Sequence, residues 1–292
     1  MTSTPSLSFK SRDRDGVTIP PSSPIEILDA PPKGRIHHAL FDFDGTISLL
    51  REGWQDVMHP MMIEMVCGES EPTADIKRAV TEFIDDTTGT QTIVQMEGLA
   101  GFVRDFKRVP ESAILDAPAY KTIYNDRLME RVRVRRDALE TGTLSIEDAT
   151  VRGVTAFIES LASRGIALYI FSGTDHDDVR HEAELLGVAK HFKAITGSVG
   201  DYAVYNKERV IKELVVEHDL AGPEVLVLGD GPVEIRHGRA HGCVTVGVAS
   251  DESTGRGWDV GKKARLTKAG AHVLVPDFAN LPELLNAISI DA

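Results

Sequence analysis

Apolar positions along the chain form short runs of strand length, separated in the second half by stretches with the period of a helix. The apolar runs lie at residues 36–43, 166–171, 225–228, 244–248 and 273–275, and the helical stretches lie at 154–163, after Thr174, at 207–216, after Val233 and at 281–288. The runs are almost continuously apolar, as expected for strands that helices cover on both faces. Alternation of helices and strands is typical of parallel sheets. The pattern therefore predicts an α/β fold with a doubly wound parallel sheet.

A different pattern fills the chain between the first two apolar runs. From Leu49 to about Gly142 no strand pattern occurs, and apolar residues recur with helical spacing in four groups, at 50–65, 76–84, 93–103 and 120–132. This pattern predicts a smaller, all-helical domain over residues 48–145, inserted into an α/β core made of residues 25–47 and 146–292. Six of the seven methionines lie in the insertion, and their spacing predicts that they pack inside the helical bundle.

The composition is that of a folded protein, with one exception at the start. Of the 292 residues, 42% are hydrophobic and 26% are charged, which argues against a collagen-like, coiled-coil or wholly disordered chain. Residues 1–24 differ, because they are rich in serine and proline and lack apolar periodicity. We expect a disordered tail there.

The charge balance limits the classes of partner. The chain has 45 acidic and 32 basic residues and a formal net charge of -13, which disfavours binding to nucleic acid or to an anionic membrane surface. No apolar run approaches the roughly 18 residues of a membrane helix, and the first ten residues lack the layout of a signal peptide. Cys67 and Cys243 show no pairing pattern, so free thiols are expected. These observations favour a cytoplasmic protein.

Polar clusters follow three of the apolar runs. DFDGT (42–46) ends the first run, SGT (172–174) follows the second, and GDGPVE (229–234) follows the third, while Lys207 lies at an expected helix start. In open α/β sheets the carboxyl ends of the strands lie at one edge, and ligands bind there. A DG pair alone is a common turn sequence, but three such clusters with a lysine predict a functional site.

Through these four clusters, in this order, the chain resembles the haloacid dehalogenase superfamily of phosphotransferases, in particular its phosphoglycolate phosphatases and β-phosphoglucomutases. The resemblance covers residues 36–46 and 146–277. It implies a Rossmann-like core with a helical cap inserted after the first motif, and a cap that selects the leaving group. The chain departs from the family at Glu234, where the fourth motif usually ends in Asp.

The resemblance also implies a role for each cluster. Asp42 would attack phosphorus and form an aspartyl-phosphate, and Asp44 would protonate the leaving oxygen and then activate water. An acid two residues after the nucleophile favours phosphate esters over halides, because a halide needs no proton to leave. The groups expected to bind phosphate are Ser172, Gly173 and Lys207. The groups expected to hold Mg²⁺ are Asp42, Asp44, Asp230 and Glu234.

Electrostatics gives an independent reason for a metal. Asp42, Asp44 and Asp230 would repel one another and a phosphate, and a hard divalent cation such as Mg²⁺ removes this repulsion. Glu234 follows Asp230 by one helical turn, so both carboxylates can face one ion. Lys207 adds a further positive charge.

The sequence thus predicts a Mg²⁺-dependent phosphatase whose partner is a small phosphate ester, such as a sugar phosphate or phosphoglycolate. A sugar phosphomutase would use the same residues and stays open. A phosphonatase would need a cap lysine for a Schiff base, and a non-catalytic binding module on this scaffold is the alternative from another class. The lysines available for a Schiff base are Lys77, Lys107 and Lys121. From position alone, the candidates for contacting a second polar group of the substrate are Arg51 and the loop 88–91.

Overall fold

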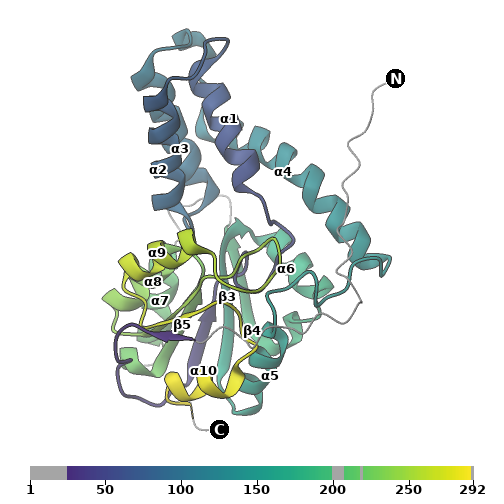
Figure 1. Ribbon diagram of the computed structural model, residues 1–292, viewed down its shortest axis with the longest axis vertical. Helices are drawn as coiled ribbons and strands as arrows, with labels where there is room; N and C mark the ends of the chain where they lie inside the picture. Colours follow the sequence, from purple (N-terminus) through teal and green to yellow (C-terminus); the bar gives the residue numbers. More distant parts are fainter. Residues whose placement is uncertain (1–24, 199–206, 218–219, 291–292) are drawn as a thin grey trace.

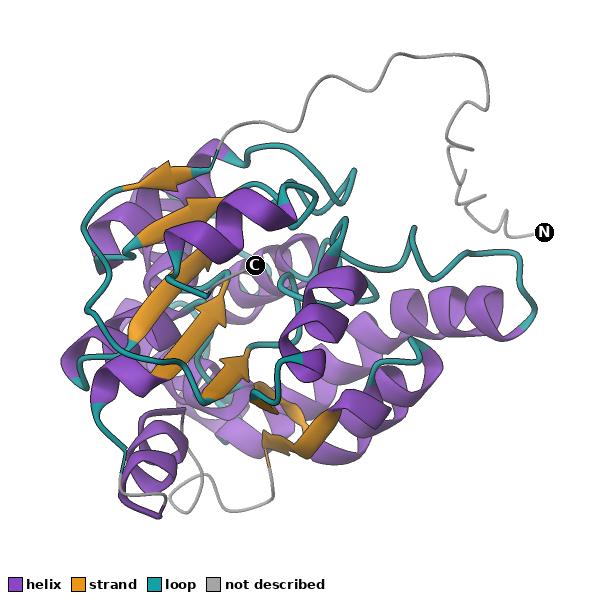
Figure 2. Cartoon of the chain, turned by 90° about the horizontal axis from the view of Figure 1, so that it is seen from below, coloured by secondary structure: helices purple, strands orange, loops and turns teal. Residues whose placement is uncertain are grey.

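The computed structural model describes residues 25–198, 207–217 and 220–290, so the tail expected at residues 1–24 lies outside this part of the chain. The described strands form one seven-stranded sheet in the order β1-β7-β6-β5-β2-β3-β4 (Figure 2). They are β1 (Glu26–Ile27), β2 (His38–Phe41), β3 (Ala167–Asp175), β4 (Phe192–Ser198), β5 (Val225–Gly229), β6 (Val244–Val248) and β7 (Val273–Val275). Neighbouring strands are parallel except that β1 pairs antiparallel with β7. The predicted α/β fold with a mostly parallel sheet is confirmed.

The register of the sheet aligns the ends of its central strands. Strand β2 lies between β5 and β3, and Phe41 at its end is opposite Ile170 in β3 and Leu228 in β5. The residues that follow these positions therefore leave the sheet at the same edge. Because the three predicted polar clusters follow β2, β3 and β5 or lie in their last residues, the fold brings the clusters together.

Helices cover both faces of the sheet, which explains the continuous apolar runs. One face packs against α5 (Val154–Ser163), α6 (His176–Leu185) and α10 (Leu281–Ala287), and the other against α7 (Lys207–Glu217), α8 (Pro232–Ala240) and α9 (Val260–Ala269). Strand β2 shows the division: Ala39 and Phe41 pack on the first face, whereas Leu40 packs against α7 on the second. A strand with two buried faces needs apolar residues at every position.

Three elements, β1, β4 and α9, were not apparent in the sequence pattern. Strand β1 has two residues, and β4 is a partly exposed edge strand that mixes Lys193 and Thr196 with apolar positions. The buried residues of α9 are Lys262 and Leu266, so this helix shows little apolar periodicity. Strand β3 also continues to Asp175, so the SGT cluster lies in the last part of the strand rather than in a turn before a helix.

Four helices lie above the sheet edge, and we refer to them together as the cap (Figure 1). They are α1 (Gln55–Cys67), α2 (Ala74–Thr87), α3 (Thr92–Phe106) and α4 (Ala117–Glu140), all within the predicted insertion. Their interior is apolar and contains Met58, Met61, Met62 and Met96, which confirms the predicted packing for these four methionines. Helix α4 is 24 residues long and runs from the cap to the side of the core, where it contacts α6.

The two segments that connect core and cap run side by side. An antiparallel bridge joins Ser48 to Thr150, and the amide of Leu49 donates a 2.8 Å hydrogen bond to the carbonyl oxygen of Ala149. The chain therefore enters and leaves the cap at adjacent points.

Two further expectations concern membrane-spanning helices and the state of the two cysteines. In the described ranges, no helix combines the length and the apolar character that crossing a membrane requires. Cys67 and Cys243 are free and buried, as expected from the lack of a pairing pattern.

Candidate active site

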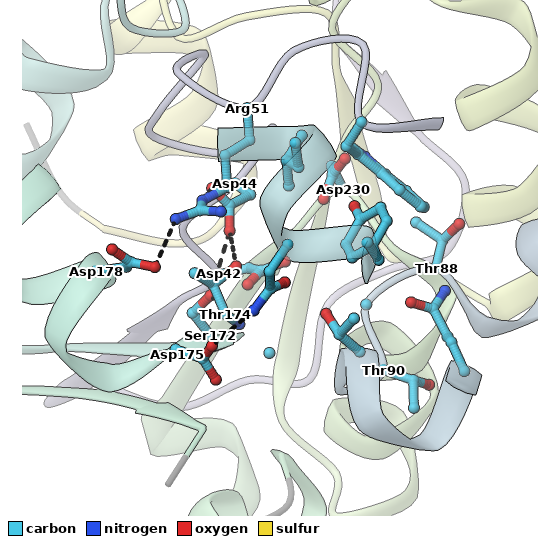
Figure 3. A pocket seen from close by; sticks show the side chains of 18 of the residues that line it. Asp42, Asp44, Arg51, Thr88, Thr90, Ser172, Thr174, Asp175, Asp178 and Asp230 are labelled. Atoms are coloured by element: carbon cyan, nitrogen blue, oxygen red, sulfur yellow. Dashed lines mark hydrogen bonds and ion pairs between the residues drawn. The ribbon is translucent and has the colours of Figure 1, made fainter. Parts of the chain in front are cut away.

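Asp42 lies at the centre of the site, directly after β2 (Figure 3). Its amide donates a 2.8 Å hydrogen bond to the carbonyl oxygen of Leu228, which fixes it against the end of β5. Its Oδ1 lies 3.0 Å from Nζ of Lys207, the first residue of α7, and the same Nζ lies 3.1 Å from Oε2 of Glu234. All three side chains are buried. The structure therefore brings these three predicted residues into direct contact.

Three buried carboxylates, those of Asp42, Asp230 and Glu234, form a candidate metal site. One oxygen from each lies within 4.8 Å of the others. Burial raises the pKa of Asp42 well above its usual range, and the neighbouring carboxylates raise this pKa further, although Lys207 opposes the change. A hard divalent cation bound by oxygen ligands would relieve this repulsion, so the cluster fits Mg²⁺. These three residues would hold the ion.

Glu234 is held in this cluster from two sides. Its Oε1 accepts a 2.7 Å hydrogen bond from the amide of Gly231 at the start of α8, and its Oε2 accepts one of 3.1 Å from Nζ of Lys207. Burial raises the pKa of Glu234, whereas Lys207 and the backbone amides favour its charged form. Asp230 and Glu234, four residues apart, thus lie in the same carboxylate cluster.

Asp230 has a second set of partners that the sequence pattern did not reveal. Its Oδ2 lies 2.7 Å from Nζ of Lys262 in the first turn of α9, and this Nζ also lies 2.5 Å from Oε1 of Glu252. All three side chains are largely buried. Helix α9 carries little apolar periodicity, so no local pattern pointed to this lysine. Lys262, itself paired with Glu252, thus holds the carboxylate of Asp230 in place.

The side chain of Asp44 is not part of the three-carboxylate cluster. Its Oδ2 accepts a 2.7 Å hydrogen bond from Oγ1 of Thr174 and one of 3.4 Å from Oγ of Ser172, while its Oδ1 lies 3.5 Å from Nε of Arg51 (Figure 3). Burial raises the pKa of Asp44 to about 6, and Arg51 limits the rise. A carboxyl group with such a pKa can both donate and accept a proton near neutral pH. The side chain of Asp44, expected to hold Mg²⁺, thus contacts Thr174, Ser172 and Arg51 instead of the cluster, and a carboxyl group in this position is suited to proton transfer.

A loop from the cap reaches the motifs of the core. Thr88 and Thr90 line the site, and Gly89 between them has φ of +89°. A Cβ atom on Gly89 would overlap Oε2 of Glu234, and one on Gly173 would lie 2.9 Å from the carbonyl oxygen of Thr90. Only glycine fits at these two contacts. The cap and the core therefore meet closely at the site.

Arg51 is surrounded by carboxylates of the core. Besides Asp44, its guanidinium contacts Asp178 at 3.4 Å (Figure 3). It also contacts Glu182 at 2.8 Å, and Arg136 of α4 pairs with both of these acids. Burial alone would lower the pKa of Arg51, but the three carboxylates raise it above its usual value. Arg51 lies beside the reacting groups, as its position suggested, but its charge is already neutralised. Glu182 and Asp178 gave no sequence signal, because they are far from Arg51 along the chain.

A cavity of about 90 Å³ lies among these groups, between the sheet edge and the cap. Its lining from the core includes Asp42, Asp44, Ser172, Gly173, Thr174, Lys207 and Asp230. Its lining from the cap and the adjoining segment includes Arg51, Trp54, Thr88, Gly89, Thr90, Gln95, Tyr124, Asn125 and Leu128. Gln91, the last residue of the loop predicted to contact substrate, is buried but is not among the lining residues. The predicted nucleophile, acid, phosphate-binding groups and metal ligands all line this cavity or contact residues that do.

Comparison with known families agrees with this geometry. The family model of haloacid dehalogenase-like hydrolases matches residues 36–242, well over half of the chain. The chain belongs to this family. The prediction that it is an enzyme, made from the DFDGT, SGT, Lys207 and GDGPVE clusters, is confirmed at the level of a hydrolase.

The individual relatives share less than a third of their sequence with this hydrolase. A 5'-nucleotidase of Pseudomonas aeruginosa is 28% identical over 214 residues, which are 73% of this chain and 83% of the relative. A β-phosphoglucomutase structure from Clostridium difficile has a TM-score of 0.58 and 13% identity, covering 87% of this chain and 97% of the other. A structure described as a predicted phosphoglycolate phosphatase from Haemophilus somnus has a TM-score of 0.56 and 14% identity, with 87% and 99% covered. The two structures share the fold with this chain.

Proposed function

We propose that this hydrolase is a Mg²⁺-dependent phosphatase that cleaves a small phosphorylated metabolite through an aspartyl-phosphate on Asp42. One observation carries the proposal: Asp42 lies in a cluster of three buried carboxylates, 3.0 Å from Lys207, with Asp44 held beside the same cavity. A carboxylate that approaches a phosphate needs positive charge around it. Lys207 and a cation held by the cluster would together supply this charge.

The proposed reaction has two steps, formation of the aspartyl-phosphate and its hydrolysis. In the first step, Oδ1 or Oδ2 of Asp42 bonds to phosphorus, the bond from phosphorus to the leaving oxygen breaks, and protonated Asp44 gives its proton to that oxygen. In the second step, Asp44 takes a proton from water, the water oxygen bonds to phosphorus, and the bond to Asp42 breaks. Thr174 and Ser172 orient Asp44 throughout. Lys207 stabilises the negative charge on the phosphoryl oxygens.

The carboxylate cluster adds a site for a cation. When bound there, Mg²⁺ supplies positive charge that offsets the repulsion between the phosphate and the acids. We expect phosphate release to stop when EDTA removes divalent ions and to return when Mg²⁺ is added. A location in the cytoplasm, inferred from the unpaired cysteines, belongs to the same proposal.

Substitution of the nucleophile tests the mechanism. With p-nitrophenyl phosphate and Mg²⁺, we expect Asp42→Asn to lower kcat by at least about a thousandfold, because an amide is a poor nucleophile and the covalent step is lost. Asp277→Asn is the matched control, because Asp277 is an equally buried aspartate that accepts a hydrogen bond from the amide of Ala279 and does not line the cavity. Full Mg²⁺-dependent activity in Asp42→Asn would contradict the mechanism.

The identity of the product separates this proposal from its alternatives. Free phosphate indicates a phosphatase, whereas an isomeric sugar phosphate without phosphate release indicates a phosphomutase. A phosphonatase would be revealed if borohydride trapped substrate on a cap lysine. Among the three candidate lysines, Lys121 pairs with Asp175 at the cavity, which makes it the first to examine. The absence of any turnover, with binding of a partner, would support the non-catalytic alternative.

A further inference from the structure

The lining of the cavity carries an excess of negative charge. Its charged residues are five aspartates and two cations, namely Asp42, Asp44, Asp175, Asp178 and Asp230 with Arg51 and Lys207. Three of the acids, Asp42, Asp44 and Asp230, have the chemical roles described above. Asp175 and Asp178 have no such role, although both are partly exposed at the cavity. Both pair with cations of α4, Lys121 and Arg136, so they lie on the side of the lining that adjoins the cap.

Both cations in the lining are already paired. Lys207 contacts Asp42 at 3.0 Å and Glu234 at 3.1 Å, and its side chain is 3% exposed. Arg51 contacts Glu182, Asp178 and Asp44, and its side chain is 8% exposed. Lys207 serves the phosphate, so Arg51 is the remaining candidate for a second anionic group. Three carboxylates already neutralise it.

Lys121, which contacts the lining from outside and lies at what we call the rim of the cavity, is paired as well. Nζ of Lys121 forms an ion pair with Oδ1 of Asp175, and Asn125 donates a 3.2 Å hydrogen bond to Oδ2 of the same residue. Asp175 thereby holds Lys121 to the rim. Residues 199–206, which the structure does not describe, contain no lysine or arginine in the sequence. Among the described residues of the lining and its rim, each cation thus has an acidic partner.

The remaining lining from the cap side is uncharged. Trp54, Tyr124 and Leu128 offer apolar and aromatic surface, and Thr90 and Gln95 offer a hydroxyl and an amide. Such groups bind hydroxyls and flat or apolar faces of a ligand. They supply no positive charge to balance a buried anion.

Resting on the proposed phosphatase function, we propose that the site selects phosphate esters whose leaving group is uncharged and bears hydroxyls, and that it rejects leaving groups with a carboxylate or a second phosphate. An anionic leaving group would lie near Asp175 and Asp178 without a free cation to pair with. Repulsion between like charges a few ångströms apart in a partly buried site is large enough to lower binding by about tenfold or more. Of the two examples that the sequence suggested, this favours a sugar phosphate over phosphoglycolate.

Matched pairs of esters test the inference. In 3-phosphoglycerate a carboxylate replaces a hydroxymethyl group of glycerol 3-phosphate, and 6-phosphogluconate differs from glucitol 6-phosphate in the same way. We expect kcat/KM to be at least about tenfold higher for the member of each pair whose leaving group is uncharged. For a pair without measurable turnover, the inhibition constant against p-nitrophenyl phosphate replaces kcat/KM, with the same expected ratio.

The outcomes separate this inference from the proposed function. Equal or better use of the acidic esters, together with Mg²⁺-dependent phosphate release, would overturn the selectivity and leave the phosphatase function intact. The absence of phosphate release from every ester, p-nitrophenyl phosphate included, would overturn the proposed function and the selectivity with it.

A charge substitution at the rim tests the physical cause. Asp175→Asn releases Lys121 and removes one negative charge, so we expect the ratio of kcat/KM for 3-phosphoglycerate over glycerol 3-phosphate to rise about tenfold. The double variant Asp175→Asn/Lys121→Met should lose most of this gain. Glu64→Gln is the control, because it also removes a carboxylate paired with a cation, Arg127, but lies on the surface of the cap outside the lining. An unchanged ratio in Asp175→Asn would overturn the electrostatic explanation.

Discussion

The α/β core and the helical cap place their charged residues in different ways. In the core, acids and lysines are buried beside one another at the sheet edge, and Asp42, Asp230, Glu234, Lys207 and Lys262 are each less than a tenth exposed. In the cap, the interior is apolar, and pairs such as Arg127 with Glu64 lie on the surface. The core therefore holds the reacting groups through buried charge, whereas the cap folds through apolar packing.

The difference extends to how the two parts meet. Polar groups dominate the junction: Arg136 of α4 pairs with Glu182 and Asp178 of the core, and Lys121 pairs with Asp175. Polar contacts of this kind are directional and can be broken and reformed without exposing a large apolar surface. We infer that the buried ion pairs of the core hold the side chains of the site in place, whereas the ion pairs at the junction set the position of the cap above them.

The largest effect on stability is expected when a buried cation is removed from the core. Lys262→Met would leave Asp230 and Glu252 buried without their partner, and we expect the free energy of unfolding to fall by about 3–5 kcal/mol. Urea unfolding in EDTA measures this loss without interference from a metal. Lys263→Met is the adjacent control, because Lys263 is about one third exposed and pairs with Glu26, so its loss should cost about 1 kcal/mol or less. Equal losses in the two variants would show that burial does not distinguish these pairs.

A smaller effect is expected at the junction. Glu182→Gln removes the negative charge that Arg51 and Arg136 share, and we expect a loss of about 2–3 kcal/mol in the free energy of unfolding. Hydrogen exchange should become faster in α4 as well as in α6, because the ion pairs join these helices. Glu184→Gln, on the same helix but exposed and paired with Arg180, should change stability by less than about 0.5 kcal/mol. Unchanged exchange in α4 would mean that these ion pairs do not hold the cap.

The smallest effect should appear where the cap loop touches the site. Gly89→Ala places a Cβ against Glu234, so we expect kcat/KM to fall by about tenfold because the loop must move away. Gly142→Ala is the matched control, since Gly142 also has a positive φ but no atom would lie within 4 Å of the new Cβ. Both variants should lose about 1 kcal/mol of stability from backbone strain, and only Gly89→Ala should lose activity. Equal kinetics in the two variants would contradict the role of this contact.

The sequence predicted those features whose signal is local. The buried strands appeared as apolar runs, and Asp42, Ser172, Lys207 and Asp230 appeared as polar residues at their ends or at a helix start. The helical insertion was visible because its apolar positions keep a regular period over long stretches. In each case the information lies within a few residues along the chain.

The features that the sequence did not reveal depend on partners far apart in the chain. The role of Lys262 depends on its ion pairs with Asp230 and Glu252, which form only in the fold. It also lies on a helix with little apolar periodicity. The edge strand β4 lacks a continuous apolar run, because one of its sides is exposed. Arg51 was noted for its closeness to the first motif, but two of the three carboxylates that neutralise it, Asp178 and Glu182, lie more than 120 residues later.

The antiparallel bridge between Ser48 and Thr150 has a consequence for how such a protein can change over time. Because the two ends of the insertion are hydrogen-bonded to each other, the helical segment spans only a short distance at the sheet, whatever its length or sequence. One insertion could be exchanged for another of different shape while β2 and β3 keep their pairing. Such an exchange would replace the cap residues that line the cavity, such as Tyr124 and Leu128, and would leave the strand ends that carry Asp42 and Asp230 in place.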